Sequence, residues 1–440
     1  MLRSLILGYP YLTTKRLIKK TEYWSADDLK AIQRNNLSRI LHYAMKNIPF
    51  YKESLKKVDI DNTNDPFELL KKFPIVDKTQ IRKNLNSFIR STGIRTLRGN
   101  SGGSTGQPVV FYLDRFVTRQ KEKSFIHDLW GRVGYKFGDR IFNIRGRTPT
   151  KNRFLHHDRL FNIYYASSLN INKNNIDDYI YQIKKIQPHF LHGYPSTIYQ
   201  LAKFIKSSKS NLNLKFKAIL CGSEKLFDFQ RQTIESVFDC RVFSWYGQSE
   251  CVTLAGECEH SHAYHVYPQY GYTEFLPTGL KNEQGKEIYD IVATGFINPV
   301  MPFIRYRCGD YAILSDVQNC QCGRNYFLID EIIGREQEFV VDANEDLIST
   351  TTLIFGQHFE IFKGIESMQI HQDKPGEIEI IIVKGENYHD ELTNLMKEKI
   401  YTLLGDRMKL WVSFSNNISR TSIGKAKLVD QKLDIKEYLR

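Results

Sequence analysis

Between residues 141 and 247, short apolar segments alternate with amphipathic ones, and small residues follow several of the apolar segments. Three segments have the composition of strands: Ile141–Ile144, Lys217–Ser223 and Val242–Gly247. Three others have apolar residues at helical spacing: Ile176–Ile186, Ile198–Ile205 and Asp228–Phe238. Strands that alternate with helices indicate a parallel α/β sheet, in which ligands bind beyond the carboxyl ends of the strands. Glycine turns at Gly222 and Gly247 fall at such ends, and Leu191–Ser196 is expected to be a further turn.

The pattern changes twice in the second half of the chain. From Tyr272 it is strand-rich, with strands expected at three places: Tyr272–Phe275, Ile288–Ala293 and Phe303–Tyr306. After about residue 335 a compact β-β-α-β unit is expected, comprising a hairpin of Met368–Gln372 and Ile378–Val383, a helix Tyr388–Leu404 closed by Gly405, and a strand Leu410–Phe414. The predicted fold is therefore α/β, with a large N-terminal domain (1–334) of parallel and mixed sheets and a smaller, mobile C-terminal α+β domain (335–440).

The formal net charge is +13, and part of it is concentrated at the start of the chain, at Arg3, Lys15, Arg16, Lys19 and Lys20. Apolar residues lie between these cations. Such a basic amphipathic start can lie on an anionic membrane face, or it can pack on the main domain as a solvated helix, and we favour the second interpretation. The other cations are spread along the chain without a recognition module, so we expect no nucleic-acid partner.

The expected compartment follows from two further features. No apolar run reaches the ~20 residues of a membrane span, and the first residues lack the apolar core and cleavage site of a secretory signal. The seven cysteines are an odd number, which argues against a disulfide framework. We expect a cytoplasmic protein, and the basic start leaves peripheral association with the inner membrane face or with a lipid-linked glycan open.

A loop rich in glycine and hydroxyl side chains, Ser101-Gly102-Gly103-Ser104-Thr105-Gly106-Gln107-Pro108, precedes the strand-like run Val109–Leu113. Glycines let backbone N–H groups face a bound anion, and hydroxyls add donors to phosphate oxygens. The loop lacks the Gly-Lys-Ser/Thr ending of a Walker loop. A polyphosphate cradle and a flexible surface loop are both compatible with this stretch alone.

Four later motifs carry residues suited to nucleotide chemistry, although each also has an ordinary structural interpretation. They are Tyr246-Gly247-Gln248-Ser249-Glu250, Arg305-Tyr306-Arg307-Cys308-Gly309-Asp310, Gly334-Arg335 and Ser419-Arg420-Thr421-Ser422-Ile423-Gly424-Lys425. A carboxylate such as Glu250 can bind the Mg²⁺ of a nucleotide, and Asp310 can accept from ribose hydroxyls. Taken singly, these motifs are equally compatible with turns, a hinge and a solvated lysine.

The order and spacing of these five motifs resemble the adenylate-forming superfamily of acyl-CoA synthetases and related ligases. Flanking segments resemble the branch of phenylacetate–CoA ligases and CapK-type capsule-biosynthesis proteins: Leu41–Ala44, Ile48–Tyr51, Phe73–Lys78, Gly193–Ser196 and Met301–Tyr306. The resemblance runs from about residue 30 to the end. It implies an enzyme that joins a carboxylate to ATP as acyl-AMP with release of pyrophosphate, after which the C-terminal domain rotates and the acyl group passes to CoA or to an amine.

The resemblance also implies roles for individual residues. The phosphates would be bound by Ser101, Ser104, Thr105 and Gly106. The adenine pocket would be lined by Ser223, Glu224, Tyr246 and Gly247. The ribose would be bound by Asp310 and Arg335. Glu250 would bind Mg²⁺, and Lys425 would stabilise the charge that develops at the α-phosphate. Two positions depart from the pattern: Gln337 stands at the hinge, where Asp or Lys is usual, and Gly102 replaces a hydroxyl residue.

A metal site is expected from Cys258, His265, Cys320 and Cys322. Three thiols and one imidazole form a donor set suited to a closed, structural Zn²⁺ site, and some phenylacetate–CoA ligase relatives carry a comparable set. His260 and His262 are close enough in sequence to replace His265, and reduced buried thiols remain the alternative. Two competing functions stay open: a zinc-stapled basic protein that binds nucleic acid or acidic polymer without catalysis, and an inactive nucleotide-binding relative.

Overall fold

The computed structural model describes residues 7–56, 58, 63–90, 96–101, 109–145, 154–167, 171, 175–207, 215–281, 284–333, 339–353, 364–385, 387–419 and 428–438. One large sheet is built from β3 (Ile141–Arg145), β4 (Leu155–Asp158), β5 (Ile163–Ser167), β6 (Phe190–Gly193), β7 (Ala218–Gly222), β8 (Val242–Gly247), β9 (Leu254–Gly256), β10 (Tyr264–Val266), β11 (Gly271–Lys281), β12 (Glu287–Gly295), β13 (Tyr306–Leu314) and β14 (Phe327–Ile333). Its strand order is β11-β12-β13-β14-β10-β9-β8-β7-β6-β3-β5-β4.

This sheet has a parallel half and an antiparallel half. Strands β8, β7, β6, β3 and β5 pair in parallel, whereas β9 to β14 and the edge strand β4 pair antiparallel. Strand β7 is buried along its whole length, as a central parallel strand covered on both faces must be. The mixed α/β architecture expected from the sequence is confirmed.

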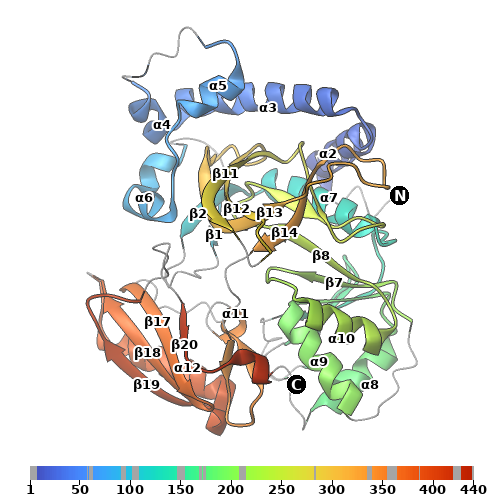
Figure 1. The fold of residues 1–440 in the computed structure, drawn as a ribbon, viewed down its shortest axis with the longest axis vertical. Helices are drawn as coiled ribbons and strands as arrows, with labels where there is room; N and C mark the ends of the chain where they lie inside the picture. Colours follow the sequence, from blue (N-terminus) through green and yellow to red (C-terminus); the bar gives the residue numbers. More distant parts are fainter. Residues whose placement is uncertain are drawn as a thin grey trace.

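Helices α8 (Ile176–Ile186), α9 (Pro195–Ser207) and α10 (Asp228–Phe238) cover one face of the parallel half, as Figure 1 shows. Their apolar sides form one core cluster with the strands, in which Ile183, Ile198 and Ile234 are fully buried. Helix α7 (Thr118–Gly131) contributes Leu129 and Trp130 to a second cluster with Leu220 and Phe243 of β7 and β8. The expected helices at 176–186 and 228–238 are confirmed at those bounds.

Two local expectations are wrong. Leu191–Gly193 continues strand β6 instead of forming a turn, because these residues pair with β3 on one side and β7 on the other. Phe303–Arg305 precedes the strand β13 instead of starting it. Arg305 has φ +48°, a left-handed conformation that interrupts extended backbone, so the strand begins at Tyr306.

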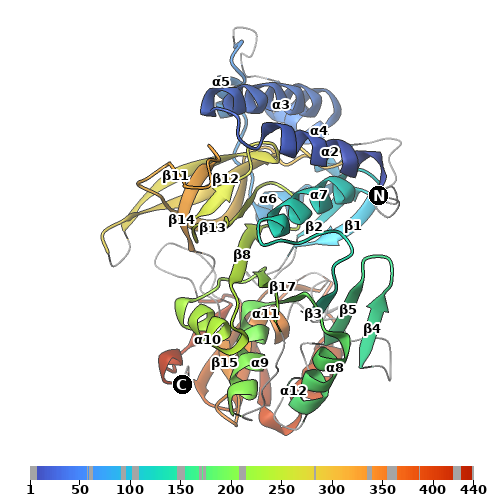
Figure 2. The same cartoon turned by 90° about the vertical axis from the view of Figure 1, so that its right-hand side faces the viewer.

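The N-terminal part forms a helical layer at one end of the molecule (Figures 1 and 2). Its elements are α2 (Gly8–Thr21), α3 (Ala26–Asn47), α4 (Pro49–Ser54), α5 (Pro66–Lys71), α6 (Lys78–Lys83), the 3-10 helix η1 (Leu85–Phe88), and the hairpin of β1 (Thr96–Asn100) and β2 (Val110–Asp114). Helix α3 is capped by Ser25, whose side chain accepts from the Asp28 N–H. Asp65 caps α5 in the same way, with Pro66 in the first turn.

Two of the flanking motifs meet in space. The backbone N–H of Val76 donates to the carbonyl of Arg305 at 3.0 Å, and the N–H of Arg307 donates to the carbonyl of Val76 at 2.9 Å. The segment Phe73–Lys78 thereby adds a short bridge to the start of β13. The Arg305 side chain reinforces it with a two-point ion pair to Glu274 and bonds to the carbonyls of Lys71 and Phe73.

The C-terminal part has its own sheet and core. It contains β15 (Phe339–Val341), β16 (Leu347–Ser349), α11 (Thr350–Leu353), β17 (Ile365–Lys374), β18 (Glu377–Lys384), α12 (Asp390–Leu404), η4 (Gly405–Arg407), β19 (Lys409–Phe414), β20 (Val429–Gln431) and η5 (Ile435–Tyr438). Four strands form a sheet in the order β19-β18-β17-β20. The expected hairpin, helix and strand are present, and Gly405 ends α12 with φ +53°. The boundary at residue 335 stays a prediction, because 334–338 lie outside the described residues.

Candidate functional site

The candidate site lies where the parallel strands β7 and β8 end. Gly222 of β7 pairs with Trp245 of β8, and a Cβ atom on Gly222 would stand only 2.7 Å from the Trp245 ring. The chain turns directly afterwards at Ser223, whose φ is +72°. A residue without a side chain is thus required beside the ring. The turn then presents Ser223 and Glu224 at the edge of the sheet, as the sequence predicts for a ligand site.

Glu224 is fixed by the first turn of the neighbouring helix. Its Oε2 atom accepts a hydrogen bond from the backbone N–H of Ser196 at 3.2 Å, at the start of α9. The first N–H groups of a helix have no partner within that helix, and the positive end of the helix dipole favours a carboxylate there. Glu224 is therefore held in place next to the end of β6.

Two tyrosine–carboxylate pairs join the end of β8 to the start of β13. The hydroxyl of Tyr246 donates to Asp310 Oδ2 at 2.9 Å, and the hydroxyl of Tyr306 donates to Glu250 Oε1 at 3.0 Å. The Gln248 amide in turn donates to the Tyr246 hydroxyl oxygen. Two motifs that are about 60 residues apart in sequence are therefore in contact, as the sequence expectation of a shared site requires.

The carboxylates at this junction act on the thiol of Cys308, which lies between Tyr306 and Asp310 in sequence. Burial raises the pKa of this thiol well above its ordinary value, and the negative charges of Asp310 and Glu250 raise it further. Cys308 is therefore a neutral, fully buried thiol. Glu250 is itself only 4% exposed, whereas Gly247 and Ser249 are open to solvent.

The described structure reaches the base of the glycine–hydroxyl loop. Ser101 is buried, and its Oγ accepts a hydrogen bond from the Val109 N–H at 2.8 Å. The Ser101 N–H donates to the Val109 carbonyl at 2.9 Å, so the loop is closed at its two ends. Gly102, Ser104, Thr105 and Gly106 lie outside the described residues, as do Arg335, Gln337 and Lys425.

Cys258, His265, Cys320 and Cys322 form a compact cluster in the antiparallel half of the sheet. Their ligand atoms all lie within 4.8 Å of one another, with 3.5 Å between the Sγ atoms of Cys258 and Cys320 and 3.8 Å from Cys322 Sγ to His265 Nε2. Ligand atoms around a tetrahedral zinc stand about 3.7 Å apart when Zn–S is ~2.3 Å. Three thiols and one imidazole at this spacing fit Zn²⁺. Of the three histidines considered, His265 is the one in the cluster.

The surroundings of the cluster favour the metal-binding protonation states of Cys258 and His265, whereas burial raises the pKa of the Cys320 thiol to about 11. Burial alone would raise the pKa of the Cys258 thiol, but hydrogen bonds from His265, from the backbone N–H of His260 and from Ser261 lower it to about 5. Burial lowers the pKa of His265, which favours the neutral imidazole that binds metals. A thiolate next to a neutral imidazole is the combination that a zinc ion requires.

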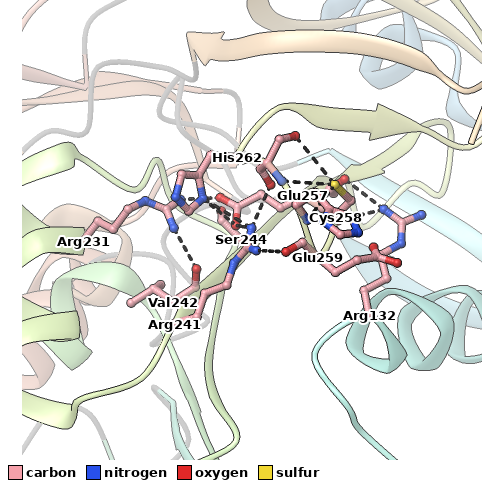
Figure 3. A network of polar contacts seen from close by, with 12 residues as sticks. Arg132, Arg231, Arg241, Val242, Ser244, Glu257, Cys258, Glu259 and His262 are labelled. Atoms are coloured by element: carbon pink, nitrogen blue, oxygen red, sulfur yellow. Dashed lines mark hydrogen bonds and ion pairs between the residues drawn. The ribbon is translucent and has the colours of Figure 1, made fainter. Parts of the chain in front are cut away.

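A network of polar and charged contacts is centred on the segment Glu257–Glu259, which contains Cys258 (Figure 3). Glu257 is fully buried and pairs with Arg231, with Arg241 at 3.4 Å and with His262 at 3.4 Å. On the other side of this segment, Arg132 donates to the Glu257 carbonyl at 2.8 Å. Cys258 is thereby held between two ion-paired residues, Glu257 and Glu259.

Arg324 extends this network to the N-terminal layer. It is 5% exposed and bridges Glu259, at 2.8 Å, and Glu22, at 2.6 Å, just after helix α2. Sequence reasoning identified the four residues of the Cys/His cluster but missed Tyr306, Ser196, Glu257 and Arg324. The acidic residues on both sides of Cys258 are the one signal in the sequence that indicates such a network.

Sequence comparisons find similar proteins among CapK proteins and phenylacetate-coenzyme A ligases. A family profile described as the CapK C-terminal domain matches residues 342–432. Protein CapK of Staphylococcus aureus is 25% identical over 409 residues, covering 91% of this chain and 88% of that protein. The phenylacetate-coenzyme A ligase of Aromatoleum evansii is 24% identical over 463 residues, covering 94% of this chain and 96% of that protein.

Solved structures give the fold. Crystal structures of 2-hydroxyisobutyryl-CoA ligase match with TM-scores of 0.56 in the postadenylation state with R3-HIB-AMP and 0.57 in the thioesterification state with 2-HIB-AMP and CoA. The first of these structures is 18% identical in sequence and the match covers 96% of this chain and 93% of the ligase. The second is 17% identical and the match covers 94% of this chain and 92% of the ligase. At these identities the likeness establishes the architecture.

Proposed function

We propose that this chain, which belongs to the adenylate-forming superfamily and within it to the branch of CapK proteins and phenylacetate–CoA ligases, is an ATP-dependent carboxylate ligase. A carboxylate oxygen of the substrate bonds to the α-phosphorus of ATP, and pyrophosphate leaves. The CoA thiolate then attacks the acyl carbonyl carbon, and AMP leaves with the electron pair of the broken bond. The observation that carries the proposal is the contact of Tyr246 with Asp310 and of Glu250 with Tyr306 at the carboxyl edge of the sheet.

The nucleotide would lie along this edge. We assign the adenine pocket to Ser223, Glu224, Tyr246 and Gly247, and the ribose to Asp310. An ionised carboxylate accepts several hydrogen bonds, so Asp310 can receive the Tyr246 hydroxyl and still accept from ribose hydroxyls. The Tyr246 bond orients the carboxylate before the nucleotide arrives, which lowers the entropy lost on binding.

The remaining predicted site residues would bind the phosphates of ATP and their Mg²⁺. We assign the β- and γ-phosphates to the loop residues Ser101, Ser104, Thr105 and Gly106, and Mg²⁺ to Glu250, because a carboxylate that accepts from Tyr306 through one oxygen can bind a metal through the other. Arg335 would complete the ribose site. Lys425 would place its cation at the α-phosphate, where negative charge develops during adenylation.

The acceptor and the acid are less closely defined by these residues. CoA is supported by the likeness to the phenylacetate-coenzyme A ligase of Aromatoleum evansii and to the ligase structure that contains CoA. An amine acceptor and a role in capsule or other surface polysaccharide synthesis rest on the likeness to CapK. We also propose that residues 335–440 form a mobile lid, which brings Lys425 to the site for adenylation and removes it for transfer.

Acid-dependent exchange of labelled pyrophosphate into ATP, screened over a panel of carboxylic acids, tests the first half-reaction. With the acid that supports exchange, Lys425→Ala should lower the rate by roughly 100-fold or more, because the developing charge loses its cation. Lys427→Ala, two residues away in the same segment, is the matched control and should stay within about threefold. Exchange that survives Lys425→Ala would remove this lysine from the catalytic set.

A second assay separates the loop from the fold. Ser104→Ala and Thr105→Ala should slow adenylation far more than transfer from preformed acyl-AMP, since only the first step involves pyrophosphate. Equal loss in both half-reactions would mean that the loop only shapes the fold.

We further propose that the cluster of Cys258, His265, Cys320 and Cys322 binds a structural Zn²⁺. Four protein ligands leave no open position for water or substrate. The metal would therefore hold the segments Cys258–His265 and Cys320–Cys322 together and take no part in the chemistry. Protein purified without added zinc should contain about one equivalent, and a strong chelator should lower its melting temperature. Less than about half an equivalent, together with a melting temperature that the chelator does not change, would contradict the site.

A further inference from the structure

Helix α2 has two very different faces. Its buried residues are Tyr11, Thr14, Ile18 and Thr21, which recur at helical spacing on one side. The Tyr11 hydroxyl lies 3.0 Å from His127 Nδ1 on α7, and Thr21 Oγ1 accepts from Gln269 Nε2 at 2.8 Å. This inner face is therefore packed on the main domain, as favoured from the sequence, and α2 is a rigid platform for whatever its other face presents.

The outer face is basic and partly apolar. Lys15, Arg16, Lys19 and Lys20 are exposed, and no acidic residue occurs between Gly8 and Thr21. Within the described part of the chain none of these cations has an ion-pair partner; Lys20 lies over the Trp24 ring at 5.8 Å. Three large side chains are exposed along or just after the helix: Tyr9 at 77%, Leu17 at 39% and Tyr23 at 59%.

The charge of α2 differs from that of the surface helices α3 and α8, and the acid-free helices α6 and α9 carry fewer cations than α2. Helix α3 begins with Asp27 and Asp28, and α8 carries Asp177 and Asp178 before Lys184 and Lys185. These helices have both signs of charge, as solvated helices commonly do. A surface helix with four cations, exposed aromatic rings and no acid has a composition typical of binding to a negative, partly apolar surface.

We propose that the outer face of α2 docks this protein on an anionic lipid bilayer. Each Lys or Arg near such a surface strengthens binding about fivefold, and tyrosine and tryptophan rings favour the headgroup region. The contact would be peripheral, since none of the described helices is long and apolar enough to cross a membrane. In both overall views α2 lies at the end of the molecule away from the C-terminal sheet, so docking would leave that sheet in solution (Figures 1 and 2).

Cosedimentation with vesicles tests this proposal without any assay of catalysis, so its failure would leave the proposed ligase reaction untouched. The full chain should bind vesicles of phosphatidylcholine with about one third phosphatidylserine at low salt, and should not bind vesicles of phosphatidylcholine alone. Replacing Lys15, Arg16, Lys19 and Lys20 together by Gln should lower the partition coefficient by roughly 100-fold or more. Raising the salt to about 0.5 M should release the wild-type protein.

A variant with the same change in net charge elsewhere is the control. Gln at Lys184, Lys185, Lys206 and Lys397 should leave binding within about threefold, because these residues lie on other helices. Unchanged melting curves for both variants ensure that binding is compared between folded proteins. A separate variant, Tyr9→Ser with Leu17→Ser, should weaken binding by roughly three- to tenfold through lost apolar contact.

Three outcomes would overturn the proposal. The first is equal binding of the wild-type protein to both kinds of vesicle. The second is equal loss of binding in the α2 and control variants, which would indicate a general charge effect. The third is wild-type protein that ignores phosphatidylserine vesicles but binds a homopolymeric RNA, with that binding lost on substitution of the α2 cations.

Discussion

The proposed nucleotide site at the ends of β7 and β8 (the nucleotide edge) and the Cys/His cluster lie on the same large sheet, but their polar groups have different kinds of partner. At the edge, Asp310 accepts from the Tyr246 hydroxyl and Glu250 from the Tyr306 hydroxyl, and a carboxylate can accept several hydrogen bonds at once. In the cluster, the ligand atoms of three thiols and one imidazole lie within 4.8 Å of one another. The first arrangement is suited to a ligand that binds and dissociates in each catalytic cycle, whereas the second is suited to a permanently bound structural metal.

The residues that hold the two regions in place also differ, and those around the cluster are more deeply buried. The cluster is enclosed by the fully buried Glu257 and by Arg324, which is 5% exposed. The edge depends on turns, on Ser223 with φ +72°, and on segments predicted to approach from elsewhere in the chain. Local stability is expected to be higher around the cluster than around the edge, as is usual for a structural element beside a ligand site.

Removal of a cluster ligand should have the largest effect on stability. Cys320→Ser should abolish stoichiometric zinc and lower the apparent melting temperature by roughly 5–10 °C, because metal binding contributes directly to folding. Nucleotide affinity, measured by titration below the transition, should change by less than about twofold. Metal analysis and thermal scans check both statements.

Cys240→Ser is the control for that comparison. Cys240 is partly buried and is not part of the cluster, so its replacement should lower the melting temperature by under about 2 °C. A matching loss in both variants would show that any thiol substitution destabilises the fold, and the contrast between cluster and edge would lose its basis.

The charge network should have the next largest effect. Glu257→Gln removes the negative charge that Arg231 and Arg241 share in a buried position. Breaking such a pair leaves uncompensated buried charge, and we expect a cost of about 2–4 kcal/mol in the free energy of unfolding. Denaturant titration of the variant measures it.

The exposed pair of Glu68 and Lys71, 2.7 Å apart, provides the control for the network. Glu68→Gln should leave the denaturation midpoint unchanged, because solvent and salt screen exposed ion pairs. A Glu257→Gln midpoint equal to that of the wild type would mean that the network contributes nothing to holding Cys258.

The sequence predicted three strands of the parallel half, β3, β7 and β8, because their signals are local, whereas β6 was expected to be a turn and β5 was not predicted. Ile176–Ile186 and Asp228–Phe238 have strong helical periodicity, and the apolar runs at 218–222 and 242–247 are typical of strands. The prediction failed at Phe303–Arg305, where an apolar run looks like a strand. Its conformation is set by Arg305, whose ion pair with Glu274 is a long-range contact that periodicity does not report.

The same distinction explains which site residues were found. Cysteine spacing and short glycine motifs are visible in the chain, so the cluster and the Tyr246–Glu250 turn could be identified. Tyr306 and Arg324 act only through partners distant in sequence, Glu250 and Glu22. Such pairings depend on strand order and on helix placement, which a single sequence does not specify.

At the nucleotide edge, Tyr306→Phe should affect activity more than stability. The change removes the hydroxyl donor of the buried Glu250 carboxylate, and an unsatisfied buried acceptor costs about 1–3 kcal/mol. We expect roughly a tenfold lower rate of pyrophosphate exchange and a higher Mg²⁺ requirement. Tyr289→Phe removes a comparable hydroxyl from the exposed Glu287 and should leave exchange unchanged.

Tyr246→Phe should have the smallest effect of the four, and it sharpens the contrast most. Asp310 keeps its charge but loses the hydroxyl that orients it, so KM for ATP should rise about fivefold while the rate at saturating ATP changes little. The zinc content and the melting temperature should match the wild type, since β8 remains paired on both sides. A fall in zinc content with an unchanged KM would place Tyr246 in the support of the cluster instead of the nucleotide site, and the two regions would then have to be treated as one.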